Sequence, residues 1–422
     1  MHKIQRLAAE TVCEVLAGRG LSAALAALWR RVRPEPSERG AIQDLSCGAL
    51  RHYGPLSALV AILAARPPAD PYLRCLLLVA LYQLRFTLAK PYAVVDQAVD
   101  AAPLSAKGFV NALLRRFLRE QHTVWTQATA TDPGRFSHPQ WWIDRVRTEY
   151  PAIFMTILEA GNERPPLTLR VNRRRITPEA YFERLREQGI GAERIGPEAI
   201  VLADPRPVAE IPGFAEGLCS VHDAGAQRAA HYLEVGDGLR VLDACAAPGG
   251  KASHILELAR VELTALDADC ERLARVAENL ARLGLAAHLL CADARKAATW
   301  WDGVAFDRVL LDAPCSASGV VRRHPDAKWL RRESDVAQFA ELQRTLLDSV
   351  WQVVASDGKL LYVTCSVFKE ENQLQSQFFL ERHPDAYLVP LADPELVEGQ
   401  LLPSARHDGF YYALFWKRSP GA

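Results

Sequence analysis

The sequence of 422 residues is long enough for two or three domains, and its 49% hydrophobic and 24% charged residues are ordinary for a globular protein. The amphipathic start has no signal-peptide layout and no apolar run approaches the length of a membrane span, so a cytoplasmic location without membrane contact is expected. Nine cysteines, an odd number without CxxC spacing, predict reduced thiols rather than disulfides or a zinc site, and no metal is expected.

The charge is balanced overall, with 50 Lys and Arg against 50 Asp and Glu, but it is unevenly distributed. Residues 1–140 hold 17 basic against 10 acidic residues, whereas residues 226–422 hold 22 against 27. A basic first third indicates contact with a polyanion, although a surplus of this size also fits an ordinary solvated surface.

Residues 1–125 are predicted to form an all-helical domain. Apolar residues recur at helical spacing in 7–16, 21–29, 41–50, 56–63, 72–84, 93–101 and 109–117. Prolines at 34–36, 67–68 and 91 separate several of these segments, because proline ends a helix and disfavours helical backbone before it. The short connections predict a compact helical domain.

The last of these helices carries an apolar face beside Arg115, Arg116 and Arg119. These arginines form either a solvated basic face or a set of contacts to RNA phosphates. The residues alone leave both interpretations open.

Residues 126–233 are predicted to form linker helices and a small α/β subdomain. Trp141 and Trp142 begin an amphipathic helix to about residue 150, and a second helix is expected near 151–162. Alternation over 167–175 predicts a strand, and 177–189 a helix with Thr177 as N-cap and Pro178 at its first position. Further strands at 200–202 and 217–221 suggest a βαβ-type arrangement, and a helix over 223–233 leads into the next domain.

Strands and helices alternate from residue 234 to residue 422. Strands are expected at 240–245, 262–267, 287–291, 308–312 and 359–364, and helices at about 250–260, 270–283, 292–300, 336–355 and 370–382. This order predicts an α/β fold with a mostly parallel, doubly wound sheet and helices on both faces. The apolar segment 409–417 predicts a late, antiparallel strand.

The loop after the first of these strands is a candidate cofactor site. It runs Cys245, Ala246, Ala247, Pro248, Gly249, Gly250, Lys251. The two glycines permit positive φ and close approach of the backbone to a ligand, and the following helix start offers free N–H groups. The run matches neither GxGxxG nor GxxxxGK(S/T), so the loop alone does not identify the cofactor.

Acidic residues stand at the ends of the next strands. Asp267 ends the second strand, Asp293 follows the third and Asp312 ends the fourth. Asp267 or Asp293 alone could be a helix N-cap. Three acids at successive strand ends, facing one glycine-rich loop, favour a ligand that contains adenosine, with Asp267 on the ribose and Asp293 on the adenine amine.

Cys315 and Cys365 follow the fourth and fifth strands, and each precedes a serine. A thiolate there, stabilised by a helix N-terminus or by Lys251, is a competent nucleophile. Two thiols could also form a redox pair, but no other feature indicates a disulfide oxidoreductase.

These motifs carry two resemblances. The helical layout of residues 1–125, with Arg51-His52-Tyr53 and the VNALLRR run, resembles the RNA-binding domain of NusB-type antitermination factors. AAPGGK, LDAD, DAPCSASG and YVTCS, in this order, resemble the Sun/Nop2 family of RNA cytosine-5 methyltransferases, and residues 322–329 extend the match. Together they cover essentially the whole chain. They imply a Rossmann-like class I methyltransferase sheet, preceded by a small α+β subdomain and an all-helical NusB-like domain.

The resemblance also implies a reaction. It implies methyl transfer from S-adenosylmethionine to C5 of one cytosine of 16S rRNA, position 967 in standard rRNA numbering, through a covalent adduct at C6. Cys365 is then the nucleophile, and Cys315 assists removal of the C5 proton and release of the enzyme. Asp312 lies near the methionine part of the cofactor and can hydrogen-bond the base. The target base must be flipped or unpaired to expose C5 and C6.

Further expectations concern the partner. Arg322, Arg323 and Lys328 are expected to contact RNA, with a solvated loop as the alternative. The partner is expected to be 16S rRNA, naked or in an early assembly intermediate, and the chain a monomer. Ser318 replaces a threonine common in the family and His222 a more usual glutamine, which leaves the role of His222 open.

Two other functions compete. An amino-group methyltransferase needs a polar-Pro-Pro-aromatic run after the fourth strand, and Asp312-Ala313-Pro314-Cys315 is not one. A non-catalytic RNA-binding or ribosome-assembly factor with this fold would not need Cys315, Cys365, Asp312 and Lys251, and all four are present.

Overall fold

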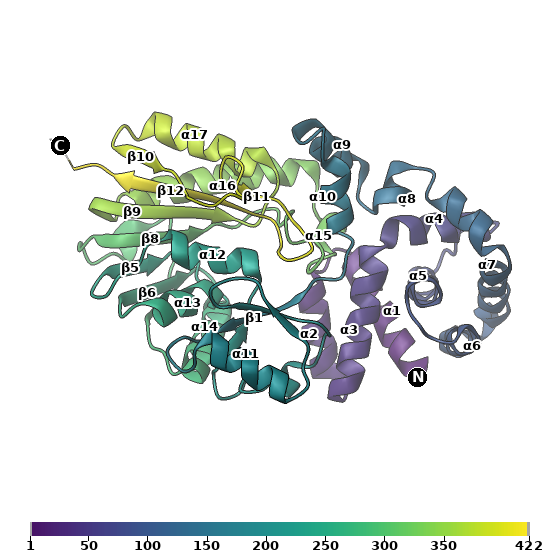
Figure 1. Cartoon of the computed structure of the whole chain (residues 1–422). Coiled ribbons are helices and arrows are strands. Elements are labelled where there is room, and N and C mark those ends of the chain that lie inside the picture. Colours follow the sequence, from purple (N-terminus) through teal and green to yellow (C-terminus); the bar gives the residue numbers. More distant parts are fainter. Residues whose placement is uncertain (1, 420–422) are drawn as a thin grey trace. The chain divides into compact units, whose positions relative to one another are not determined.

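The computed structural model describes residues 2–419 of the chain (Figure 1). The chain divides into two compact units, Met1–Arg164 with Val321–Glu333 and Pro165–Val320 with Ser334–Ala422. The first unit extends past residue 125, where the sequence suggested a boundary, and it includes a segment from much later in the chain. No helix within residues 2–419 is both long enough and apolar enough to cross a bilayer.

The first unit is helical, as predicted. Pro36, Pro71 and Pro91 each stand at the start of a helix, where the missing N–H costs no hydrogen bond. The middle of α5 is buried over residues 76–81, so this helix forms the centre of the core. The elements are α1 (His2–Leu16), α2 (Leu21–Val32), α3 (Pro36–Arg51), α4 (Tyr53–Leu63), α5 (Pro71–Phe86), α6 (Pro91–Ala101), η1 (Leu104–Ala106), α7 (Lys107–Ala128), α8 (Asp132–Phe136), α9 (Gln140–Glu149), α10 (Phe154–Ala160) and α15 (Ala327–Leu330).

The segment 321–333 packs within this helical unit. Trp329 Nε1 donates to Leu50 O at 2.7 Å, and Lys328 Nζ donates to Arg51 O at 2.9 Å. Both acceptors lie in the last turn of α3, where helix carbonyls lack partners from their own helix. The segment 321–333 therefore supplies hydrogen-bond donors to carbonyl groups at the C-terminal end of α3.

The prediction that Arg322 and Lys328 contact RNA is wrong. Their side chains are 1% and 0% exposed, and Lys328 Nζ also donates to Asn162 Oδ1 at 2.7 Å. Burial, together with the nearby charge of Arg51, lowers the pKa of Lys328 well below its usual value. The side chains of Arg322 and Lys328 pack within the helical unit, while Arg323 remains partly exposed.

The second unit begins with a small sheet in the order β2-β3-β1-β4, in which every pairing is antiparallel. Because β3 lies between β1 and β2, the β1–α11–β2 segment is a split βαβ unit, and the two parallel strands are not neighbours. Thr177 caps α11 as predicted, since its Oγ1 accepts from Ala180 N at 3.2 Å. The elements are β1 (Leu167–Val171), α11 (Pro178–Glu187), β2 (Ala192–Arg194), β3 (Ala199–Leu202), η2 (Val208–Glu210) and β4 (Cys219–Val221).

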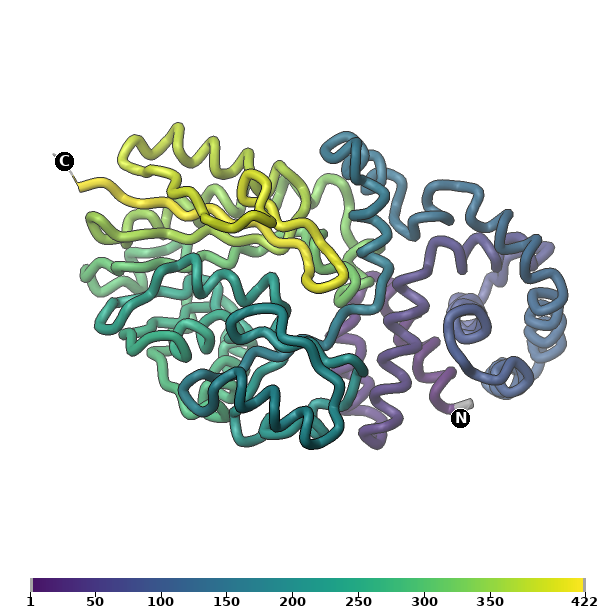
Figure 2. The backbone as a smooth tube through the Cα atoms, viewed as in Figure 1, coloured from purple at the N-terminus to yellow at the C-terminus, as the bar shows by residue number. Residues whose placement is uncertain are grey.

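The larger sheet has the order β10-β12-β9-β8-β5-β6-β7, and β11 pairs with β12. Its pairings from β9 through β7 are parallel, whereas β12 is antiparallel to both β9 and β10. Figure 2 shows the final yellow strand beside β9, so the predicted late antiparallel strand is confirmed. The strands are β5 (Arg240–Asp243), β6 (Glu262–Asp267), β7 (His288–Cys291), β8 (Phe306–Asp312), β9 (Val354–Thr364), β10 (Ala386–Val389), β11 (Gln400–Leu401) and β12 (Phe410–Lys417).

Helices cover both faces of this sheet (Figure 1). Neighbouring side chains of a strand point to opposite faces, so Val241 and Leu242 belong to different cores. Val241 packs with α12 (Ala224–Tyr232), α13 (Gly250–Leu258) and α14 (Cys270–Leu283), and Leu242 with α16 (Glu333–Trp351) and α17 (Gln373–Arg382). The predicted doubly wound α/β fold is confirmed.

One predicted helix does not form. Residues 292–300 contain only the short turn η3 (Ala297–Thr299). Asp293 Oδ1 accepts from Arg295 N at 3.0 Å, and such a local bond favours a turn over a helix.

Candidate active site

The loop between β5 and α13 has the conformation that its glycines predict. The Ala247–Pro248 peptide is cis, and Gly249 has a φ of 97° directly before α13. A Cβ on Gly249 would lie 3.1 Å from Val276 Cγ1 of α14, so packing and φ both disfavour a larger residue. Arg272 of α14 donates to Ala247 O at 2.8 Å and ties the loop to that helix.

Lys251 is paired with the acid at the end of β8. Its Nζ lies 2.6 Å from Asp312 Oδ2, and its side chain is 11% exposed. Burial acts to lower the pKa of Lys251, but the charge and hydrogen bond of Asp312 outweigh it and raise the pKa above its usual value. The cation is compensated inside the protein, so this loop is poorly suited to phosphate.

Asp267 lies against the same loop. It is 6% exposed, and its carboxylate accepts from Ala247 N and from Asp269 N, both at 3.0 Å. Asp269 is the N-cap of α14, with Oδ1 accepting from Glu271 N and Arg272 N. The alternative that Asp267 caps the helix is therefore excluded.

Asp293 follows β7 and is held by Arg295. The Arg295 guanidinium donates to Asp293 Oδ2 at 2.7 Å through Nη2. This hydrogen bond lowers the pKa of Asp293, whose side chain is 23% exposed. A ligand amine at Asp293 would share the carboxylate with Arg295.

Asp243 ends β5 beside the loop, and none of the sequence motifs assigned a role to it. It is 1% exposed, and burial, together with the charge of Asp312, raises the pKa of Asp243 to about 7. Carboxylates thus stand at the carboxyl ends of the neighbouring strands β5, β6, β7 and β8. An edge of this kind suits a ligand with positive charge and hydrogen-bond donors. The sequence signal was an acidic residue directly after the apolar Val241 and Leu242 of the first strand.

The structure brings Cys315 and Cys365 together. Asp312 of β8 is opposite Val363 of β9, so the loops after both strands begin at one edge. The two Sγ atoms are 3.3 Å apart, and Cys365 is the more exposed. The hydrogen bond with Cys365, together with burial, raises the pKa of Cys315 well above its usual value. The two thiols are therefore not equivalent.

Glu371, which no sequence motif indicated, connects the two cysteine loops. It is fully buried and accepts from Ser316 N at 2.7 Å, Ser316 Oγ at 2.5 Å and Ser366 Oγ at 2.6 Å. Gln343 Nε2 adds a bond at 3.2 Å. Because these serines directly follow the two cysteines, Glu371 fixes the position of one thiol relative to the other. Nothing in the sequence distinguished it from Glu370.

Ser318 and His222, which depart from the family pattern, both make contacts near the site. Ser318 keeps the hydroxyl of threonine, and its Oγ accepts from Val367 N at 2.8 Å. His222 Nδ1 lies 2.8 Å from Arg170 Nη1, and Arg170 also donates to Gly250 O at 2.6 Å. His222 therefore belongs to the support of the cofactor loop.

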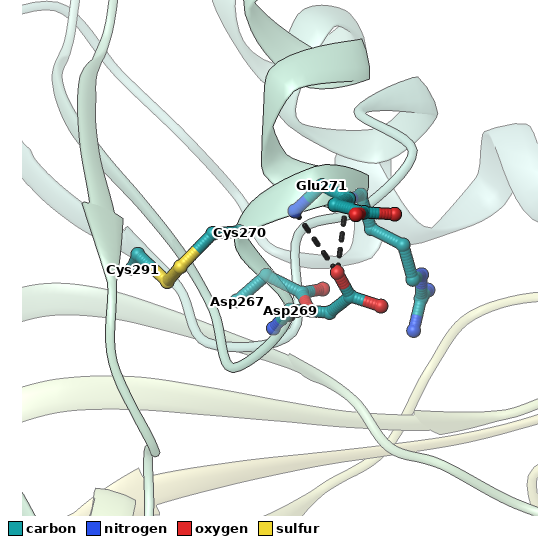
Figure 3. The surroundings of a disulfide bond; sticks show 6 residues. Asp267, Asp269, Cys270, Glu271 and Cys291 are labelled. Carbon is teal, nitrogen blue, oxygen red and sulfur yellow. Dashed lines mark hydrogen bonds between the residues drawn. A yellow bond between two sulfur atoms is a disulfide. The ribbon is translucent and has the colours of Figure 1, made fainter.

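The prediction that all cysteines are reduced is wrong for one pair. Cys270 at the start of α14 forms a disulfide with Cys291 at the end of β7, close to Asp267 and Asp269 (Figure 3). Their Cα atoms are 5.3 Å apart because β6 and β7 are neighbours. Sequence spacing gave no indication of this, since 21 residues separate the two.

This sheet, with a glycine-rich loop, acids at its strand ends and a compensated lysine, defines a Rossmann-like methyltransferase. Residues 230–416 match the family described as 16S rRNA methyltransferase RsmB/F. Residues 138–209 match the ferredoxin-like domain of RsmF/B-like methyltransferases, and residues 2–119 match the NusB family. The chain belongs to the RsmB/F family of 16S rRNA methyltransferases, and it is an rRNA methyltransferase.

Similar proteins cover the whole chain. Ribosomal RNA small subunit methyltransferase B of Vibrio cholerae is 43% identical over 95% of this chain and 94% of its own length. The protein of that name from Salmonella arizonae is 41% identical over 99% of both chains. A methyltransferase homolog protein from Pyrococcus horikoshii has a crystal structure that is similar to this one, with a TM-score of 0.60. The match covers 67% of this chain and 96% of that chain, with 28% sequence identity.

Proposed function

We propose that this chain transfers a methyl group from S-adenosylmethionine to C5 of a cytosine in 16S rRNA, position 967, through a covalent bond between Cys365 and C6 of the base. The observation that carries this proposal is the pair of Cys315 and Cys365 thiols, 3.3 Å apart at the ends of adjacent parallel strands. The ion pair of Lys251 and Asp312 belongs to the same edge.

The residues at this edge fit S-adenosylmethionine. The bound cofactor supplies an electrophilic methyl group on a sulfonium centre and carries no phosphate. The Lys251 charge is already neutralised by Asp312, and the remaining carboxylates suit a cationic ligand. We assign Asp267 to the ribose hydroxyls, Asp293 to the adenine amine, and the loop from Cys245 to Lys251 to the methionine end.

Two thiols suit chemistry at C5 of cytosine, because this carbon is a poor nucleophile on its own. Addition of the Cys365 thiolate to C6 makes C5 enamine-like and able to accept a methyl group. After methylation a water molecule accepts the C5 proton, the C–H electron pair re-forms the C5–C6 double bond, and the bond between sulfur and C6 breaks, so that Cys365 is regenerated as a thiolate. Cys315, within reach of Cys365, assists both steps.

The substrate base must leave its stack to reach the thiols, so the RNA is unpaired or locally opened at the target. The NusB match of residues 2–119 supports a role of the helical unit in holding that RNA. We propose a monomer that acts in the cytoplasm on naked 16S rRNA or an early assembly intermediate.

Bisulfite sequencing of 16S rRNA from cells with and without this protein tests the product. One cytosine should resist conversion only when the protein is present. The purified chain with labelled S-adenosylmethionine should restore that mark on naked 16S rRNA. A methyl group found on an exocyclic amine or on a ribose would overturn the proposal.

A further inference from the structure

Three potential metal ligands from three separate elements converge away from the thiols. Glu198 lies in the loop before β3, His231 on α12 and His254 on α13. One ligand atom from each residue lies within 4.8 Å of the other two. Glu198 Oε2 is 2.8 Å from His231 Nε2 and 3.8 Å from His254 Nε2. No spacing in the sequence connects residues 198, 231 and 254.

His254 is the unusual member of this cluster. Its side chain is 1% exposed, yet within residues 2–419 neither ring nitrogen has a hydrogen-bond partner. The separation of 3.8 Å from Glu198 Oε2 exceeds a hydrogen bond. Buried polar groups without partners are rare, and an ion or an ordered water is a common explanation. The imidazole nitrogen that faces Glu198 is therefore available as a ligand.

The neighbouring cations are already paired. Arg173 Nη1 lies 3.0 Å from Glu198 Oε1, which leaves Oε2 for the histidines. Arg170 forms two bonds of 2.8 Å to Glu257. Arg173 therefore holds the Glu198 carboxylate through one oxygen, and an outer partner of this kind orients the other oxygen as a metal ligand.

A cavity of about 320 Å³ reaches the cluster from outside. Glu198 and His231 both line it, and the His231 side chain is 35% exposed. A small ion can therefore enter, and a water molecule can occupy a fourth position on the cavity side.

We propose that Glu198 Oε2, His231 Nε2 and His254 Nε2 bind a divalent transition-metal ion of the Zn²⁺ type, with water as the fourth ligand. Two histidines, one carboxylate and one water are a donor set that Zn²⁺ adopts in proteins. Tetrahedral Zn²⁺ places its ligand atoms roughly 3.3 Å apart, since each bond is about 2.0–2.1 Å long. The ion replaces the hydrogen bond between Glu198 and His231, and the His254 ring moves toward Glu198.

Such an ion joins the small sheet to two helices of the methyltransferase fold. Glu198 precedes β3 of the small sheet, and α13 begins at Gly250 in the cofactor loop. The site is therefore structural: it fixes the helix that carries Lys251 without contacting the thiols. This inference does not depend on the proposed reaction.

The test uses the full chain, freed of metal by a chelator. Zn²⁺ is titrated in competition with a chromophoric chelator, and Co²⁺ is titrated while the visible spectrum is recorded. We expect one equivalent to bind, tetrahedral Co²⁺ bands without a thiolate charge-transfer band, and a thermal midpoint that rises until one Zn²⁺ per chain is bound. The spectrum separates this site from any ion held by the free cysteines.

His231→Gln is the decisive variant, because the partly exposed side chain can change without disturbing the core. It should weaken Zn²⁺ binding by at least about 10-fold, the lower range for losing even an outer partner of a metal ligand. His254→Gln should act in the same direction, and His288→Gln, an exposed histidine on β7, is the matched control. Unchanged affinity in His231→Gln, absence of one-equivalent binding, or a thiolate-type Co²⁺ spectrum would each overturn the proposal.

Discussion

Cys315 Sγ lies 3.3 Å from Cys365 Sγ, although 50 residues separate the two in the chain. The contact arises because β8 and β9 are adjacent and parallel, and each cysteine follows the end of its strand. Cys315 is the more buried and keeps its proton at neutral pH, since its pKa is raised by Cys365 and by burial. Two thiols in different environments suit two different tasks.

The cysteine variants should therefore behave differently. Cys365→Ala removes the nucleophile and should abolish methyl transfer from labelled S-adenosylmethionine, by on the order of 10⁴-fold or more. Cys315→Ala should still form the bond to C6 but release it poorly, and so leave a protein–RNA adduct on a denaturing gel. An adduct formed by Cys365→Ala and not by Cys315→Ala would reverse the two roles.

Glu371→Ala should misplace the two cysteine loops, because Ser316 and Ser366 lose a shared acceptor. We expect kcat to fall by about 100-fold, the scale of a displacement near 1 Å, with cofactor affinity unchanged by calorimetry. Glu371→Gln keeps one acceptor oxygen and should recover part of the rate. Glu370→Ala is the matched control. Equal loss in Glu371→Gln and Glu371→Ala would count against positioning through hydrogen bonds.

Asp243 should make the stability of the chain depend on pH. Its pKa is raised from 3.8 to about 7, so the folded chain holds a proton that the unfolded chain has lost. The stabilisation is fully present below about pH 4 and is lost as the pH rises through about 7, with an upper limit of about 4 kcal/mol. In Asp243→Asn, the thermal midpoint without cofactor should fall less between pH 5 and pH 8 than in the parent. Parallel pH profiles would contradict this assignment.

Thiol titration should detect the disulfide between Cys270 and Cys291. The denatured, unreduced chain should show seven thiols and the reduced chain all nine. Cys291→Ser should lower the free energy of unfolding by about 3 kcal/mol under oxidising conditions, the usual effect of closing a loop of this size. Nine thiols before reduction would show that the bond does not form in the purified protein.

Arg115 and Arg119 on α7 are exposed and test RNA contact by the helical unit. Each phosphate contact removed should reduce the slope of log affinity against log salt by about 1, so the double alanine variant should bind 16S rRNA with a flatter dependence. Arg186→Ala, an exposed cation of the small subdomain, is the control. An unchanged slope would identify Arg115 and Arg119 as a solvated face. Point variants are preferable to deleting residues 1–125, because the deletion also removes the partners of Trp329 and Lys328.

Local patterns predicted much of this molecule. The strand, glycine turn and helix around Gly249 followed from residue types with narrow backbone preferences. The meeting of Cys315 with Cys365 followed from parallel topology, which brings strand ends to one edge.

Features set by long-range packing could not be predicted in this way. Lys328 lies in a run of charged residues typical of a surface, yet its amine meets carbonyl and amide oxygens far away in the sequence. In the sequence Glu371 is one of two adjacent glutamates, and only its hydrogen bonds to the two cysteine loops distinguish it from Glu370. Burial of a polar side chain depends on partners that no local window contains.

The order in which the ribosome makes the chain has a consequence for the segment 321–333. The amine of Lys328 binds the carbonyl of Arg51, and the ribosome adds Lys328 to the chain 277 residues after Arg51. At about 5–20 residues per second, this interval is roughly 15–55 s. The nascent helical unit therefore stays incomplete at the end of α3 until strands β5 to β8 of the methyltransferase sheet have been made, although α3 itself is among the first helices to be made.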